Sequence, residues 1–157
     1  MVGHAGEDYH GAAAFRGAWR AVADYHTHTR YSRPTHARGS VEDNVRAALK
    51  RGLQAVAITD HGFAGLWYGL QGRRSFLALE QEIQRVRRRY PGIRILLGLE
   101  ANLVSLDGDL DVPPDILERL DLLLVGFHPH VRTRTAGDLA RLVVRNALLR
   151  RLPCLAP

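Results

Sequence analysis

Four short apolar segments alternate with helix-like segments along this chain, and this rhythm constrains the fold more than any other feature of the sequence. The apolar segments cover residues 21–25, 53–59, 93–99 and 121–127. Strands that alternate with helices form βαβ units, in which the strands run parallel in one sheet. Because these segments are apolar throughout, we expect both faces of the sheet to be covered. The pattern therefore predicts an α/β fold.

Local signals set the limits of the helices between these segments. Ser40 can cap a helix, Asp43 stands where a capping box needs an acid, and Gly52 suits the position just after the last turn. A second helix is expected over 75–90, where Pro91-Gly92 stops it. The remaining expectations are a hairpin over 102–112 turning at Asp107-Gly108, a short helix from Pro113 to Leu120 and a last helix over 135–152.

The length of 157 residues allows one domain and argues against a second. Apolar residues make up 46% and charged residues 24% of the chain, which is typical of a globular protein. A single cysteine, Cys154, excludes an internal disulfide and a cysteine-rich metal site. We see neither a membrane-length apolar run nor a signal-peptide layout, and therefore expect a cytoplasmic protein without a membrane partner.

The net charge of +6 is unevenly distributed along the chain. Residues 130–157 contain six arginines and one acid, Asp138, so the excess of positive charge lies in this stretch. A nucleic-acid footprint should lie on a folded face, so this distribution argues against a nucleic-acid partner and favours a solvated helix side. Residues 1–20 lack periodicity and are interpreted as a loose leader, with the domain spanning 21–157.

Each apolar segment is followed by side chains that can bind a metal ion: His26 and His28, Asp60 and His61, Glu100, and His128 and His130. The carboxyl ends of parallel strands meet on one side of a sheet, where active sites form. A single histidine at a strand end is usually an ordinary surface residue. Metal-binding side chains at four successive strand ends are hard to explain as a coincidence. Histidine and carboxylate ligands without thiolates favour a catalytic metal site with open positions.

Ordered motifs at these strand ends resemble those of the PHP (polymerase and histidinol phosphatase) family. They are DYHTHT at 24–29, AITDHG at 57–62, GLEAN at 98–102 and GFH at 126–128. The stretch GLEANLVSLDGDL at 98–110 looks most like the small stand-alone bacterial PHP phosphoesterases. The resemblance covers about residues 22–130.

The resemblance implies a distorted (β/α)7 barrel of TIM-like type that holds two to three Zn, Mn or Fe ions. The implied ligands are His26 and His28 for a first metal, His61 for a second, Glu100 as a bridge, His128 for a third, and His36 as a further ligand. Asp60 is expected to orient an imidazole, and with His61 and Glu100 it completes the predicted catalytic set. His130 has no settled counterpart.

The family pattern continues with an His-Pro strand and an Asp-x-His strand, and no histidine follows His130 here. Six of the nine usual ligand positions therefore have a match. We expect a C-terminally truncated PHP domain with about four parallel strands of the barrel. An open sheet edge would then favour self-association.

Two functions from different classes follow from this interpretation. The first is a metal-dependent phosphoesterase, in which a multinuclear metal site activates water against a phosphorylated small molecule or nucleotide. The second is a truncated, weakly active or inactive fragment that acts only as a metal-binding or interaction module. Turnover of a generic phosphomonoester with added Mn²⁺ separates the two.

Overall fold

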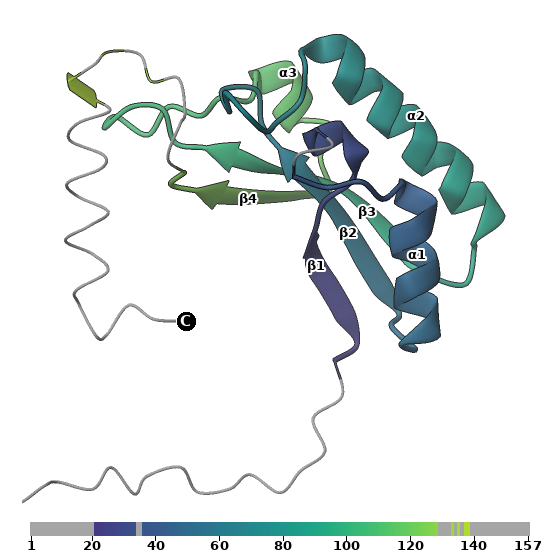
Figure 1. Cartoon of the computed structure of the whole chain (residues 1–157). Helices are drawn as coiled ribbons and strands as arrows, with labels where there is room; N and C mark the ends of the chain where they lie inside the picture. The colour runs from purple at the N-terminus through teal and green to yellow at the C-terminus, as the bar shows by residue number, and fades with distance from the viewer. Residues whose placement is uncertain (1–20, 34–35, 129–132, 134, 136, 139–157) are drawn as a thin grey trace, which may run out of the picture.

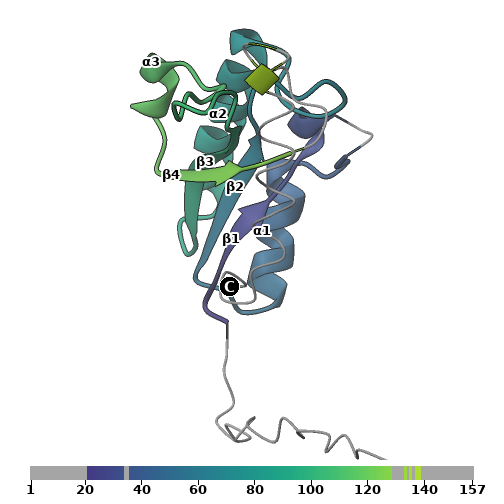
Figure 2. The same ribbon diagram turned by 90° about the vertical axis from the view of Figure 1, so that its left-hand side faces the viewer.

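A curled sheet of four parallel strands forms the centre of the molecule (Figure 1). The computed structural model describes residues 21–33, 36–128, 133, 135 and 137–138. The strands, in spatial as well as chain order, are β1 (Ala23–Thr27), β2 (Ala55–His61), β3 (Arg94–Asn102) and β4 (Leu122–Gly126). Figure 2 shows how far the strand direction turns from β1 to β4. The predicted α/β class is confirmed, and the sheet is consistent with an incomplete TIM-like barrel.

The two long helices begin and end within two residues of the predicted signals, whereas the short helix predicted to reach Leu120 ends at Leu117. They are α1 (Val41–Lys50), α2 (Arg73–Arg89) and α3 (Pro114–Leu117), with a short 3-10 helix, η1 (Arg30–Ser32), after β1. The capping box is confirmed, because the backbone N–H of Asp43 donates to the Ser40 hydroxyl at 3.1 Å and the Ser40 N–H donates to the Asp43 carboxylate at 2.8 Å. Gly52 follows α1 with a φ of 69°, a conformation that glycine adopts without strain.

The hydrophobic core lies between one face of the sheet and the two long helices. Helices α1 and α2 lie side by side on that face (Figure 1). Core residues that are almost completely buried are Val41, Val45, Val56, Ile58, Phe76, Leu79, Ile83 and Leu99. Those of α2 recur every three to four residues, as an amphipathic helix requires. This packing fixes the strands and therefore the edge where they end.

Four local expectations differ from the structure or lie outside the described residues, and one short helix was not expected. β3 continues past residue 99 to Asn102, because Asn102 still pairs with Gly126 of β4. The expected hairpin is reduced to one antiparallel bridge between Leu103 and Leu110, since the Ser105 hydroxyl and the Asp109 carboxylate bind each other within the turn. η1 was not predicted from the sequence. The predicted leader (1–20) and almost all of the last helix (135–152) lie outside the described residues.

Within the described part of the chain, β4 pairs with β3 alone. Its register partners in β3, Leu99 and Ala101, are buried, whereas Leu123 and Val125 are 36% and 53% exposed. Self-association through this edge stays a prediction. No helix among the described residues has both the length and the apolar character needed to cross a membrane.

Candidate metal centre

The predicted ligands converge at the carboxyl ends of the four strands. His26 lies in β1 and His28 just after it, His61 ends β2, Glu100 lies in β3, and His128 follows β4. His61 and Glu100 are register partners on neighbouring strands, so sheet pairing alone brings them together. Topology thus brings together residues that are up to 102 positions apart in the sequence, from His26 to His128.

The carboxylate of Glu100 lies at the centre of this group. Its Oε2 atom lies 3.1 Å from Nε2 of His26, 3.4 Å from Nε2 of His28 and 3.2 Å from Nδ1 of His61. Its Oε1 atom lies 3.0 Å from Nε2 of His128. Each oxygen therefore faces a different part of the cluster, which is the arrangement that a bridging carboxylate needs.

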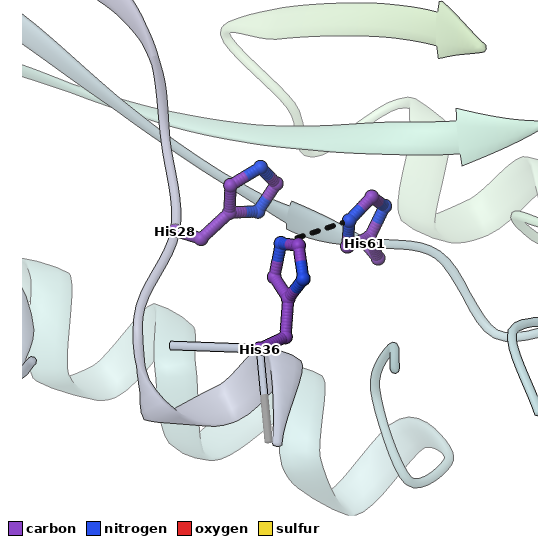
Figure 3. A group of neighbouring side chains, drawn as sticks. All are labelled: His28, His36 and His61. Carbon is purple, nitrogen blue, oxygen red and sulfur yellow. Dashed lines mark hydrogen bonds between the residues drawn. The ribbon is translucent and has the colours of Figure 1, made fainter. Parts of the chain in front are cut away.

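His36 completes the group from the loop after η1. Its Nε2 atom faces Nε2 of His61 at 3.2 Å, and its ring centroid lies 4.7 Å from that of His28 (Figure 3). Three sets of side chains hold their ligand atoms within 4.8 Å of one another: His28, His36 and His61; His26, His28 and Glu100; and His61, Glu100 and His128. The structure brings together all six of the predicted ligand residues.

The protonation states at the centre suit cation binding. Burial lowers the pKa of His28 to about 4 and that of His61 to about 3, although the Glu100 carboxylate opposes both shifts. Burial raises the pKa of Glu100, but hydrogen bonds from His128 and His26 outweigh this effect and bring it to about 2. At neutral pH the His28 and His61 rings are therefore neutral and keep a free lone pair beside an anionic carboxylate.

A PHP-domain family model matches residues 24–146 of this chain, which is most of its length. The chain belongs to the PHP family. It is 36% identical over 114 residues to a probable phosphatase of Thermoanaerobacter sp. strain X514, in an alignment that covers 69% of this chain and 41% of the relative. It is 37% identical over 107 residues to a probable phosphatase of Acetivibrio thermocellus, covering 68% and 41% of the two chains. The chain thus spans about two fifths of the length of these curated relatives.

Asp60, the third member of the predicted catalytic set, is buried behind the six candidate ligands of this PHP domain. Its fully buried carboxylate accepts hydrogen bonds from the backbone N–H of Thr29 at 2.7 Å, from the Thr29 hydroxyl at 2.6 Å and from the Ser32 hydroxyl at 2.6 Å. The Ser32 hydroxyl in turn accepts from the backbone N–H of His61 at 3.0 Å. Asp60 thus fixes the turn after His28, and its predicted orienting of an imidazole stays a prediction.

Three residues near the centre were not singled out from the sequence. Tyr68 packs its ring 4.4 Å from that of His61 and 5.7 Å from that of His128, measured between centroids. Burial, together with the Glu100 carboxylate, raises the pKa of Tyr68 to about 12, so it stays a protonated donor. Asn102 at the end of β3 contacts His128 of the cluster, and Asp111 binds Asn102 from behind. Asn102 had a usable signal, because it stands two residues after Glu100 and therefore on the same strand face.

Arginines near the strand ends are candidates for binding phosphate. Arg30 is engaged elsewhere, since its guanidinium binds the buried Glu82 carboxylate of α2. Arg132, Arg134 and the unassigned His130 lie outside the described residues.

Proposed function

We propose that this chain carries the metal-binding face of a PHP-type phosphoesterase that hydrolyses phosphate esters with an activated water. The observation that carries the proposal is the Glu100 carboxylate, which has a histidine nitrogen from each of the other three strand ends within 3.4 Å. A buried carboxylate beside the neutral imidazoles of His28 and His61 has few uses other than holding cations.

The side chains fit two or three divalent ions of the Zn, Mn or Fe type. The Nδ1 atom of His61 is buried without a hydrogen-bond partner among the described residues, although it lies 3.2 Å from Oε2 of Glu100. A buried nitrogen and a carboxylate oxygen that face each other without forming a hydrogen bond suit a cation. His26, His28, His36, His61, Glu100 and His128 would hold the ions. Bound ions would lower the pKa of a water molecule and neutralise charge on a phosphoryl group.

We further propose a phosphorylated small molecule or a nucleotide as substrate. The support is that the relatives from Thermoanaerobacter and Acetivibrio are named probable phosphatases. The residues of this chain would position the ester beside Glu100. Tyr68 would remain protonated there and could donate a hydrogen bond to a phosphoryl oxygen.

The test is hydrolysis of p-nitrophenyl phosphate by the chain with Mn²⁺ or Zn²⁺, before and after chelation. Glu100→Gln and His61→Ala should lower the metal-dependent rate by about 100-fold or more, because even partners of metal ligands cost roughly 10- to 100-fold when removed. Glu118→Gln, which changes an exposed carboxylate, is the matched control. Metal binding without turnover would overturn the phosphoesterase proposal and leave a metal-binding module.

A further inference from the structure

Asn102 and Asp111 form a relay of hydrogen bonds behind His128. We infer that these two are positioning residues that hold His128 in a single orientation, with a proton on Nδ1 and with Nε2 directed at Glu100. The inference deepens the proposed function, since it assigns the residues that prepare one of the metal ligands.

The carboxylate of Asp111 sets the direction of the Asn102 amide. Asn102 is fully buried, and its Nδ2 atom donates to Oδ2 of Asp111 at 2.6 Å. An ionised carboxylate only accepts hydrogen bonds, so the amide nitrogen must face Asp111 and the amide oxygen must face away. The Asp111 carboxylate thereby determines which end of the Asn102 amide is nitrogen and which is oxygen, an assignment that depends on the hydrogen-bond network.

The amide oxygen then sets the proton on His128. Oδ1 of Asn102 lies 2.8 Å from Nδ1 of His128. An amide oxygen cannot donate, so Nδ1 must carry the proton of this hydrogen bond. The second ring nitrogen, Nε2, lies 3.0 Å from Oε1 of Glu100. It donates to this carboxylate when it is protonated, and a metal ion would take the place of that proton.

Asp111 is itself fixed by the backbone on both sides of it. It accepts from the N–H of Asn102 at 2.7 Å and from the N–H of Ala64 at 2.7 Å. A Cβ atom on Gly62 would lie 2.3 Å from Oδ1 of Asp111, so the close approach depends on glycine at that position. Because Gly62 follows His61 directly, the relay ties His128 to the strand end that carries another candidate ligand.

The tautomer of His128 can be read from the ¹⁵N chemical shifts of its ring, assigned by their loss in His128→Gln. We expect Nδ1 to carry a proton in the wild-type chain, both metal-free and loaded with Zn²⁺. Asp111→Asn keeps the shape but lets the Asn102 amide turn over, and Asn102→Leu removes the acceptor. In both variants the proton should move to Nε2, which faces Glu100. An unprotonated Nδ1 in the wild-type chain, or an unchanged Nδ1 in both folded variants, would overturn the inference.

Zn²⁺ affinity provides the second measurement. Asp111→Asn should weaken binding of one Zn²⁺ ion about 10- to 100-fold, as is usual for a residue that orients a metal ligand. Asp107→Asn, which removes the same charge from an exposed position of the same loop, should match the wild-type chain. A chain that binds Zn²⁺ with the expected tautomer but hydrolyses no phosphomonoester would contradict the proposed function and support the relay. Turnover with equal Zn²⁺ affinity and tautomer in Asp111→Asn would contradict the relay alone.

Discussion

Glu82 of α2 accepts a hydrogen bond of 3.2 Å from the backbone N–H of Val41, the first residue of α1. The same buried carboxylate accepts from the Tyr31 hydroxyl at 3.0 Å and binds the Arg30 guanidinium. One side chain of α2 thus holds both ends of the segment that carries His36. Glu82 itself is 6% exposed, whereas the Arg30 side chain that it binds is 48% exposed.

Replacing Glu82 should loosen this segment. Glu82→Gln leaves a buried donor facing Arg30, and we expect the free energy of unfolding to fall by about 1–3 kcal/mol. Urea unfolding measures the loss. Glu80→Gln on the same helix removes a bond to the half-exposed Arg119, and should cost only about 0–1 kcal/mol. Equal losses in the two variants would contradict the role given to Glu82.

Asp60→Asn should destabilise the protein and weaken metal binding together. The new amide group would face donors from Thr29 and Ser32, which leaves at least one of them without an acceptor in a buried place. A lost bond to a buried charge costs about 1.5–3 kcal/mol. Thermal unfolding and Mn²⁺ titration measure the two effects. Asp107→Asn, at an exposed position of the loop after β3, is the control and should leave both unchanged.

Gly98 of β3 should not tolerate a larger side chain. A Cβ atom there would lie 2.9 Å from Cγ2 of Thr59 and 3.0 Å from the backbone oxygen of Leu122, so both neighbouring strands are in the way. We expect Gly98→Ala to cost about 1–3 kcal/mol in urea unfolding. Gly92→Ala meets no atom within 4 Å and serves as the control. A loss no larger than that of the control would show that the strands can move apart.

The metal-free protein should lose stability as the pH falls below about 6.5. His28 and His61 have pKa values of about 4 and 3 in the folded state against 6.5 when unfolded, so the unfolded chain binds more protons in this range. Glu100, with a pKa of about 2 against 4.5, adds to the loss below pH 4.5. Urea unfolding in EDTA at pH 7.5, 6, 5 and 4 measures the slope. His61→Gln should flatten it, and a pH-independent wild-type chain would contradict the burial of these imidazoles as neutral groups.

The convergence of the ligands could be predicted from the sequence because parallel topology alone brings strand ends together. His61 and Glu100 illustrate this, since they meet as register partners. The different positions of Asp60 and His61 follow the alternation of a strand, in which neighbouring side chains point to opposite faces. That rule predicts that only one of the two lies in the cluster.

Residues that stabilise the site through contacts with distant parts of the chain are harder to predict from the sequence. Glu82 stands among Leu79, Ile83 and Val86 on the buried face of α2, and an acid within an apolar stripe signals a buried partner. The identity of that partner depends on how η1 and α1 pack, which local patterns do not encode. Asp111 is similar, because its contact with Ala64 joins loops that follow different strands.

Because β2 and β3 carry ligands that face each other, a bound ion would favour the correct alignment of these two strands over misaligned ones. Seven consecutive residue pairs, from Ala55 with Arg94 to His61 with Glu100, define the alignment of these strands. A slip by one residue would turn the Glu100 carboxylate to the helix-covered face and away from every imidazole. An ion that needs this carboxylate would bind only the correctly aligned chain, and its binding energy would favour that alignment over every slipped competitor.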